Sequence, residues 1–386
     1  GRAYAIATRA RSFPPQDMVL GRVHGAQSRV PRNRLRRDGR SGEVRAMRQL
    51  TCTGPSTIEW RDVPEPRIQS DGEALVRPLA VARCDIDLFL TSGFFPAPEP
   101  FALGHECVGE IVALGDAVRG LEIGQRVVVA FQVSCGTCHS CGAGHTANCG
   151  KFPALSDYGM QPLSGVEYGG MLSDLTRVPY AEAMLAPVAP TLDSAALASV
   201  SDNVLDGYRA VAPHLAALPG ADVLIVNHGL KSVPLYAVQT AVALGAARVD
   251  FASDDPEALA LAERLGAHPI HTGFEKPERR YPIVVDAGVT PVGLRYAIRA
   301  TAPEGVCQSV SFYAGGEMPL PLGRLYTLGI RFFIGRAHAA ALLPEVMPLI
   351  EQGRLRPEAV TTRVVEWEEA PTAYLEPAIK LVVRRS

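Results

Sequence analysis

Residues 104–129 read GHECVGEIVALGDAVRGLEIGQRVVV and contain two short apolar or alternating runs, ECVGEIVALG and QRVVV, with Gly and Asp between them. The run EALVRPLAVARC at 73–84 has the same character. Short runs of this kind, punctuated by Gly, Pro and Asp, predict β-strands. We therefore expect residues 47–200 to form a mostly β unit of antiparallel or barrel-like type.

The pattern changes from residue 203 onward, where apolar strand-like segments alternate with helical ones. Such alternation predicts βαβ units and a parallel sheet. A further strand at 330–335 and a helix through 340–353 follow, and 373–383 ends in a strand that we expect to return to the first unit. The alternating strands are 221–227, 247–252, 281–288 and 305–313, and the helices between them are 233–245, 256–266 and 291–301.

The composition is that of an ordinary soluble globular protein with room for two domains. The chain has 386 residues, 47% of them hydrophobic and 20% charged, and single cores rarely grow past roughly 250–300 residues. It contains no run of about 18 apolar residues, so we expect no membrane-spanning helix. The first 46 residues carry a net charge of +8 and the remainder −10, which makes the body of the chain a poor candidate for nucleic-acid binding.

Residues 1–46 form a separate basic segment. They contain eleven arginines and show neither helical nor strand periodicity. They also lack the apolar region of a secretory signal. A basic arm for nucleic acid and an organelle transit peptide are two interpretations. Strand-like patterning begins directly after Met47, which favours a disordered extension or translated sequence upstream of a start at Met47.

Half of the eight cysteines crowd into residues 135–149, CGTCHSCGAGHTANC, with the spacing C-x2-C-x2-C-x7-C. Four thiolates complete a tetrahedral zinc ion and leave no position for substrate, so the pattern predicts a structural zinc site. An iron–sulfur cluster, which also takes four Cys, is the main alternative. A cysteine cluster in a long chain without a secretory signal indicates metal binding in a reducing compartment, and we expect a cytoplasmic protein. The predicted ligands are Cys135, Cys138, Cys141 and Cys149.

A second metal site needs different donors. Cys84, His105 and Glu106 offer sulfur, nitrogen and oxygen, and an open catalytic zinc takes three such protein ligands plus a water or substrate oxygen. Spacing alone does not assemble them, because a lone His between Gly and Glu is more often a packed or capping residue.

The stretch 104–129, the four-Cys segment and the βαβ half follow one another in an order that resembles the zinc-dependent medium-chain dehydrogenase/reductase superfamily, of the alcohol dehydrogenase type. The resemblance covers 47–386. It implies an α/β protein with a GroES-like β-rich catalytic domain at 47–203 and 345–386. A Rossmann-like, doubly wound parallel-sheet cofactor domain is implied at 204–344. It also implies a small-molecule alcohol or carbonyl substrate and a homodimer or homotetramer.

The same resemblance implies the ligands of a catalytic zinc. Cys84 and His105 match two of them, and Asp202 matches the third, with Asp206 as the alternative four residues further on. Glu106 matches an acid that is an occasional fourth ligand. Zinc acts in this chemistry as a Lewis acid on an alkoxide or carbonyl, and a nicotinamide cofactor, NAD or NADP, takes or gives the hydride.

Two features depart from the family's pattern. The positions that commonly relay a proton in this family hold Ile86 and Phe89, whose side chains cannot carry a proton. Asp87, between them, matches an acid that orients a zinc-ligand His. In the cofactor loop, within VLIVNHGLKSVPLYAV at 223–238, only one glycine of the expected fingerprint is kept. Ser232 is placed to cap the following helix, whose first turn tolerates proline. The cofactor contacts implied are Gly229, Lys231, Ser232, Val233, Ser253, Arg336 and Lys380. For Lys231, Arg336 and Lys380 the alternative is a solvated surface cation.

The leading hypothesis is a zinc-dependent oxidoreductase that transfers a hydride between NAD(P) and an alcohol/aldehyde or ketone substrate. The first alternative is a family member that keeps the structural zinc, binds dinucleotide poorly and serves as a binding or scaffold protein. A zinc-assisted lyase or hydrolase is less favoured, since nothing supplies a dedicated nucleophile.

Overall fold

A computed structural model describes residues 45–95, 100–164, 166, 168–313 and 317–386. One compact unit comprises 44–311 with 321–386, and a second comprises 1–43 with 312–320. Of the second unit, only 312–313 and 317–320 are described, and they form no helix or strand. The predicted basic extension lies outside the described residues up to 44, while Ala46 is already the first residue of strand β1.

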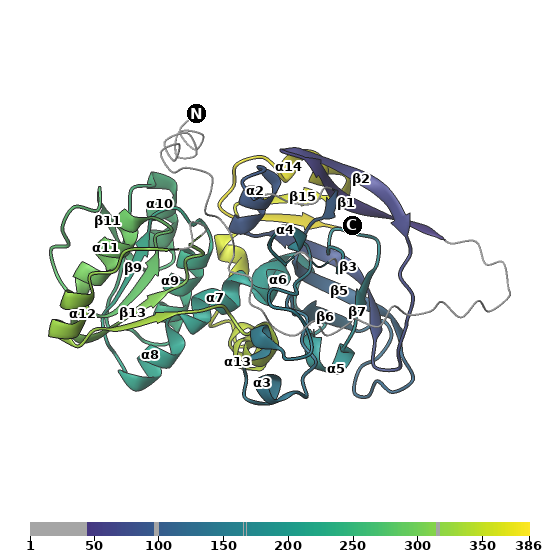
Figure 1. Cartoon of the computed structure of the whole chain (residues 1–386), viewed down its shortest axis with the longest axis horizontal. Helices are drawn as coiled ribbons and strands as arrows, with labels where there is room; N and C mark the ends of the chain where they lie inside the picture. Colours follow the sequence, from purple (N-terminus) through teal and green to yellow (C-terminus); the bar gives the residue numbers. More distant parts are fainter. Residues whose placement is uncertain (1–44, 96–99, 165, 167, 314–316) are drawn as a thin grey trace. The chain divides into compact units, whose positions relative to one another are not determined.

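The first half of the large unit is built mostly on antiparallel strands, as its alternating runs predict, and strand β15 joins β16 in parallel. Its larger sheet has the order β15-β16-β3-β5-β6-β8, with β7 paired to β3, and its smaller sheet has the order β2-β1-β4 (Figure 1). The bounds are β1 Ala46–Gly54, β2 Thr57–Pro64, β3 Ala74–Arg83, β4 Phe101–Ala102, β5 Glu106–Leu114, β6 Arg126–Val129, β7 Thr176–Val178, β8 Leu185–Pro187, β15 Arg363–Glu366 and β16 Leu381–Arg384.

The end of the chain returns to this sheet, which confirms the prediction made for 373–383. Strand β16 pairs antiparallel with β3, so that Leu381 lies opposite Arg83. Lys380 therefore reaches the sheet beside the end of β3, where Cys84 follows. This return places a residue from the end of the chain next to the predicted catalytic cysteine.

The second half forms the parallel sheet that the alternation predicts. Its order is β11-β10-β9-β12-β13-β14, and every neighbouring pair is parallel. In this doubly wound order the switch point lies between β9 and β12, where dinucleotides bind beyond the carboxyl ends of the strands. The bounds are β9 Val223–Asn227, β10 Val249–Ser253, β11 His268–His271, β12 Tyr281–Ala287, β13 Thr301–Ser309 and β14 Arg331–Ile334.

Helices connect these strands and pack on them, α9 on β9, α10 on β10 and α11 on β12 (Figure 1). Helix α7, which follows Asp202, approaches α9 closely, since a Cβ on Gly207 would lie 2.7 Å from the backbone nitrogen of Ala237. This approach brings the segment around Asp202 to the beginning of α9. The bounds are α7 Asn203–Arg209, α8 Ala212–Ala217, α9 Val233–Ala243, α10 Pro256–Arg264, α11 Pro291–Ala300, α12 Leu322–Leu328 and α13 Ala339–Glu351.

Short helices complete the large unit. The predicted division into domains at 203/204 and 344/345 stays a prediction. No helix in the described part of the chain is both long and apolar enough to cross a bilayer. The short helices are α2 Asp85–Thr91, α3 His139–Gly142, η1 Thr146–Asn148, α4 Gln161–Ser164, α5 Ala181–Met184, α6 Ser194–Leu197, η2 Ala198–Ser201, η3 Pro357–Val360, η4 Trp367–Glu369 and α14 Ala370–Ala373.

Candidate functional site

The first group of potential metal ligands lies where β3 and β5 pair. Cys84 directly follows β3 and is the N-cap residue of α2. His105 directly precedes β5, and Glu106 is the first residue of that strand. Because Ala82 pairs with Glu106 across the two strands, the register brings Cys84 and His105 to the same end of the sheet. Asp202 joins them from the junction between η2 and α7.

These four side chains converge on one point. Each offers one ligand atom, and the four atoms of Cys84, His105, Glu106 and Asp202 all lie within 4.8 Å of one another. All four residues are buried, and His105 Nε2 lies 3.3 Å from Asp202 Oδ2. The donors are sulfur, nitrogen and oxygen, the mixture typical of catalytic zinc sites.

The imidazole of His105 tests whether this cluster fits a metal ion. The ring is entirely buried, and each of its nitrogens lies 3.3 Å from a carboxylate oxygen, of Asp87 or of Asp202. Neither nitrogen makes a hydrogen bond of ordinary geometry to any described residue. Buried polar atoms seldom lack a partner, and each exception calls for an explanation such as an ion. A cation bound by His105 Nε2, Cys84 Sγ and Asp202 Oδ2 supplies that partner. The residues therefore fit zinc.

Asp87, in the first turn of α2, contacts the other nitrogen of the His105 ring. Its Oδ1 lies 3.3 Å from His105 Nδ1. Its Oδ2 accepts hydrogen bonds from the backbone N–H of Cys84 at 2.9 Å and from the hydroxyl of Tyr374 at 2.7 Å. A carboxylate behind a ligating imidazole fixes the ring's orientation and raises its basicity. Asp87 thus occupies the place that the sequence predicts for it.

Asn203 links the cluster to its surroundings through both ends of its amide. Its Nδ2 donates to Cys84 Sγ at 3.1 Å and to Asp202 Oδ2 at 2.9 Å. Its Oδ1 accepts from Lys380 Nζ at 2.6 Å and from Ser232 Oγ at 2.7 Å. The last bond ties the metal cluster directly to the loop at the start of α9.

Burial is the largest influence on ionisation in the cluster. It raises the pKa of the Cys84 thiol to about 12, with Asp202 adding to the effect. It raises the pKa of Glu106 to about 7, with Lys380 acting in the opposite direction. Burial lowers the pKa of His105, but the charge of Asp87 and the contact with Asp202 outweigh it, so the pKa lies well above its usual value. Zinc takes thiolate and neutral imidazole, so its binding releases protons here.

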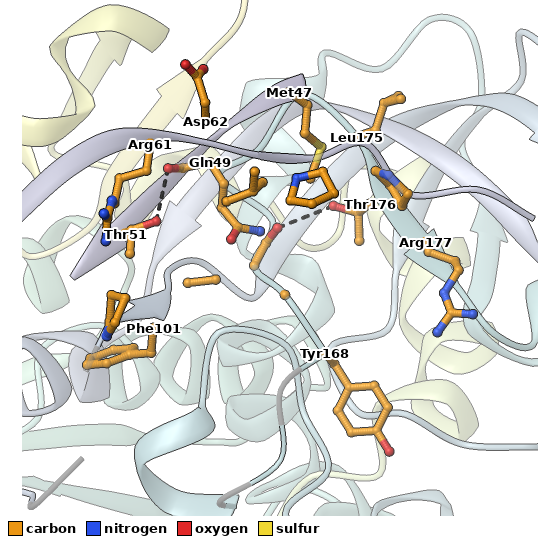
Figure 2. A pocket seen from close by; sticks show the side chains of 17 residues that line it. Met47, Gln49, Thr51, Arg61, Asp62, Phe101, Tyr168, Leu175, Thr176 and Arg177 are labelled. Carbon is orange, nitrogen blue, oxygen red and sulfur yellow. Dashed lines mark hydrogen bonds between the residues drawn. The ribbon is translucent and has the colours of Figure 1, made fainter. Parts of the chain in front are cut away.

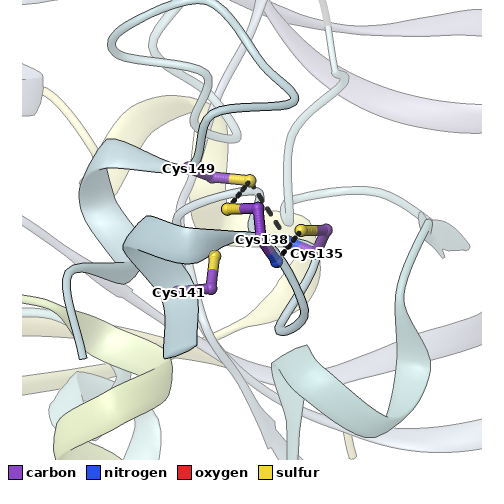
Figure 3. A group of neighbouring side chains, drawn as sticks. All are labelled: Cys135, Cys138, Cys141 and Cys149. Atoms are coloured by element: carbon purple, nitrogen blue, oxygen red, sulfur yellow. Dashed lines mark hydrogen bonds between the residues drawn. The ribbon is translucent and has the colours of Figure 1, made fainter. Parts of the chain in front are cut away.

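The second group consists of the four cysteines of 135–149, whose sulfur atoms converge (Figure 3). Backbone amides point at the sulfurs: Cys138 N donates to Cys135 Sγ at 3.3 Å, and Gly150 N donates to Cys138 Sγ at 3.4 Å. Hydrogen bonds from the backbone lower the pKa of Cys138 to about 6. Four converging thiols that are free of disulfides fit the predicted structural zinc.

A cavity of about 450 Å³ lies elsewhere in the first half, beside strands β1 and β2 (Figure 2). Gln49, Arg61, Tyr168 and Arg177 are among its lining residues. None of the four residues of the first metal cluster lines it, so the cavity is separate from the candidate site.

Comparison with known proteins agrees with this geometry. The alcohol dehydrogenase GroES-like domain family matches residues 70–188. Sorbitol dehydrogenase of Bacillus subtilis is 30% identical over 279 residues, which cover 68% of this chain and 74% of that protein. A probable zinc-binding alcohol dehydrogenase of Mycobacterium tuberculosis is 28% identical over 335 residues, covering 85% and 84% of the two chains.

This chain belongs to the zinc-dependent medium-chain dehydrogenase/reductase superfamily. The structure of an alcohol dehydrogenase from Thermus sp. ATN1 superposes on it with a TM-score of 0.80 at 28% identity, over 88% of this chain and 100% of that one. The predicted fold class, a GroES-like domain with a Rossmann-like domain, is confirmed. The chain is a zinc-dependent oxidoreductase, and nothing in the comparisons favours a scaffold protein.

The cofactor loop of this superfamily member keeps its predicted form but not its predicted hydrogen bond. Gly229 has a φ of +125°, which only glycine adopts without strain. Ser232 is the N-cap residue of α9 and proline stands in the first turn, as expected. The Ser232 side chain makes no capping hydrogen bond, and its hydroxyl donates to Asn203 Oδ1. Val233 begins α9 and is buried.

Other predicted cofactor contacts have partners within the protein. Lys231 Nζ pairs with Asp255 Oδ2 at 2.8 Å. Ser253 ends β10, where its Oγ accepts hydrogen bonds from Asn227 Nδ2 at 3.3 Å and from the backbone of Asp255 at 3.1 Å. Whether these residues contact a cofactor stays a prediction.

Arg336 and Lys380 are held by carboxylates. Arg336 forms an ion pair with Asp157, while Lys380 is entirely buried and pairs with Glu106. The alternative zinc ligand Asp206 lies outside the four-residue cluster and pairs with Arg209 at 2.5 Å. The structure thus brings Asp202, and not Asp206, to the other donors.

Asn203, Asp85 and Tyr374 are the residues that sequence reasoning missed. Asn203 is adjacent to Asp202 and Asp85 to Cys84, so proximity to a ligand was the only signal available for either. Tyr374 reaches Asp87 from far along the chain, and no local pattern marks it.

Proposed function

We propose that this chain is a nicotinamide-dependent zinc alcohol dehydrogenase-like enzyme that interconverts an alcohol and its aldehyde or ketone. Cys84, His105 and Asp202 hold the catalytic zinc, and Glu106 is the occasional fourth ligand. The observation that carries this proposal is the buried convergence of sulfur, nitrogen and oxygen donors, with Asp87 beside the other nitrogen of the His105 ring.

When bound, zinc supplies Lewis acidity at the substrate oxygen, and the nicotinamide supplies or accepts the hydride. The chain's own residues position these groups. Asp87 orients His105, and Asn203 fixes Cys84 and Asp202 relative to each other. These contacts hold the donors in one arrangement, as pre-organised metal sites require.

The position of the cofactor follows from the sheet. A dinucleotide binds beyond the carboxyl ends of β9 and β12, at the start of α9. The bond between Ser232 Oγ and Asn203 Oδ1 joins that place to the zinc ligands. Hydride transfer needs this proximity, because the nicotinamide must face the substrate carbon while the metal contacts the oxygen on that same carbon.

The substrate proton does not leave through the two positions of α2 that commonly relay it in this family. Ile86 and Phe89 have no group that can accept or donate a proton. The hydroxyl of Tyr374 is engaged by Asp87 behind the imidazole. The route therefore differs from the relay that the family commonly uses.

The proposal includes a homodimer or homotetramer in the cytoplasm. Strand β14 is an edge of its sheet, and exposed apolar side chains gather on it and on α12, namely Leu322, Tyr326, Phe333 and Ile334. Large exposed apolar side chains mark association surfaces. All eight cysteines are free of disulfides, as expected in a reducing compartment.

The experiment is a titration of the zinc-loaded protein with NADH and NADPH, following energy transfer to the nicotinamide. Turnover of a panel of primary and secondary alcohols, with Cys84→Ser as the matched control, then reports the chemistry. Binding of one dinucleotide and turnover that Cys84→Ser abolishes supports the proposal. Failure to bind either dinucleotide at millimolar concentration contradicts it.

A further inference from the structure

The carboxylate of Asp85 is hydrogen-bonded to the backbone amides at the start of α9. Its Oδ2 accepts hydrogen bonds from the backbone N–H of Lys231 at 2.7 Å and of Ser232 at 3.0 Å. The side chain comes from the first residue of α2, more than a hundred residues earlier in the chain, and the residue is only 9% exposed. The carboxylate and the loop thus meet through tertiary structure.

These amides are the ones that a dinucleotide needs. In a doubly wound fold the pyrophosphate binds to the N–H groups of the turn after the first strand and of the following helix N-terminus. That strand is β9, and Lys231 and Ser232 stand directly before α9. Each N–H donates one hydrogen bond, so the carboxylate of Asp85 and the pyrophosphate require the same donors.

A second observation indicates that this loop still receives a ligand. Asn227, the last residue of β9, is 2% exposed, and its Oδ1 has no hydrogen-bond partner in the part of the chain that the structure describes. Its Nδ2 points to Ser253, the position where the sequence predicts contact with a cofactor ribose. A buried acceptor at this place suits a ligand hydroxyl, because leaving it without a partner is unfavourable.

The charge at this position also opposes the ligand. Lys231, the cation of the loop, is already paired with Asp255, which in addition caps α10 through the N–H groups of Glu257 and Ala258. Asp85 adds a negative charge beside the amides. A pyrophosphate therefore meets a carboxylate at the place where its own negative charge is best accommodated.

We propose that Asp85 is an intramolecular competitor of the dinucleotide pyrophosphate and sets the affinity of the cofactor site. This inference rests on the proposed function, since it assumes that the β9–α9 loop takes NAD(P). The cofactor binds only as the carboxylate leaves the amides of Lys231 and Ser232. Asp85 is a positioning residue in this account, and it takes no part in the hydride transfer.

The experiment compares Asp85→Ala and Asp85→Asn with the wild type. Asp85→Ala removes the occupant, and Asp85→Asn removes its charge at nearly constant size. The probes are NADH, ADP-ribose, which carries the pyrophosphate, and adenosine, which carries no phosphate. Calorimetric titration gives each dissociation constant, and thermal melting reports any loss of stability.

A matched control is Asp193→Asn. Asp193 is also a helix-capping carboxylate, accepting a hydrogen bond from Ala196 N at 3.0 Å at the start of α6. It stands directly before α6, outside the loop between β9 and α9. Its substitution is expected to leave all three dissociation constants unchanged.

We expect Asp85→Ala to bind NADH and ADP-ribose at least tenfold more tightly than the wild type, which corresponds to about 1.4 kcal/mol. Asp85→Asn is expected to show a smaller gain, and adenosine none. Equal or weaker binding of NADH and ADP-ribose by both variants overturns the inference, and a lower melting temperature with that result assigns Asp85 a purely structural role. If neither wild type nor variants bind any dinucleotide, the proposed function fails as well; if the wild type binds and the variants match it, only this inference fails.

Discussion

Lys380 Nζ donates a hydrogen bond to Glu106 Oε2, and both side chains are entirely buried. Lys380 precedes β16 and Glu106 begins β5, so the pair joins the end of the chain to the strand that directly follows His105. The same ammonium group donates to Asn203 Oδ1 at 2.6 Å. The charge pair thus contacts the metal cluster through Glu106 and through Asn203.

Removing the cation leaves a buried carboxylate without its partner. We expect Lys380→Met to lower the free energy of unfolding by roughly 3–5 kcal/mol, the usual cost of breaking a buried ion pair on one side. Denaturant titration measures the change. The double variant with Glu106→Gln is expected to recover most of the loss, because no uncompensated charge remains. A loss below about 1 kcal/mol in the single variant would show that Glu106 is satisfied in another way.

The four-cysteine group is expected to contribute to folding rather than to chemistry. Cys138→Ser removes one of four thiolates, and we expect unfolding to become easier by roughly 3 kcal/mol or more, since the binding energy of a structural zinc is largely folding energy. Zinc analysis should show one zinc fewer per chain. As a control, a chelator that strips this site should lower the melting temperature of the wild type but hardly that of the variant. Unchanged stability would argue against a structural metal.

Most of the fold could be predicted from the sequence, because periodicity reports burial. Five of the six strands of the parallel sheet and the return of β16 were predicted from apolar runs, and the structure contains them. Strand β11 and helix α12 were missed. The four residues of β11 include a proline and no buried side chain, so the segment shows no strand pattern. Helix α12, LGRLYTL, has apolar residues at helical spacing but is only seven residues long and buries none of them.

The site was predictable in part for a different reason. Cys84, His105, Glu106 and Asp202 were found through a family pattern, whereas the contacts of Asn203 and Asp85 depend on which segments meet in three dimensions. Ser232 shows how far local sequence rules can predict side-chain contacts. Its position as an N-cap was predicted correctly, but the hydrogen bond went to a tertiary partner that no local rule anticipates.

Asp157 is expected to make stability depend on pH. Burial raises its pKa to about 6, with Arg336 acting in the opposite direction. A carboxyl whose folded pKa exceeds its unfolded value of about 3.9 stabilises the fold when protonated, and this contribution disappears as the pH rises through 6. For these two values the contribution is about 1.4 kcal/mol at pH 5 and close to zero at pH 7.5.

Denaturant titrations of the wild type and of Asp157→Asn across that pH range give the difference between their free energies of unfolding. Effects of pH that both proteins share cancel in this difference. We expect the wild type to lose about 1.4 kcal/mol relative to the variant between pH 5 and 7.5. Asp116→Asn, at an exposed position, is the control and should run parallel to the wild type. Parallel curves for Asp157→Asn would contradict the prediction.

Asp87 is expected to set the affinity of the catalytic zinc through His105. We expect Asp87→Asn to weaken zinc binding at this site by 10–100-fold, as other substitutions behind a ligating histidine do. Competition with a chromogenic chelator measures the affinity. Tyr374→Phe, which removes only the hydroxyl that donates to Asp87 Oδ2, should have a smaller effect of the same sign. Equal affinities in Asp87→Asn and the wild type would mean that the imidazole needs no support from this carboxylate.

The most direct test of the account is the zinc content of the purified chain and of Cys84→Ser, measured by elemental analysis together with turnover and melting temperature. We predict two zinc ions per wild-type chain and one per Cys84→Ser chain, with turnover abolished and the melting temperature nearly unchanged in the variant. A wild-type chain that holds one zinc, or a Cys84→Ser chain that keeps two and still turns over, would contradict the assignment of Cys84, His105 and Asp202 as the catalytic zinc site.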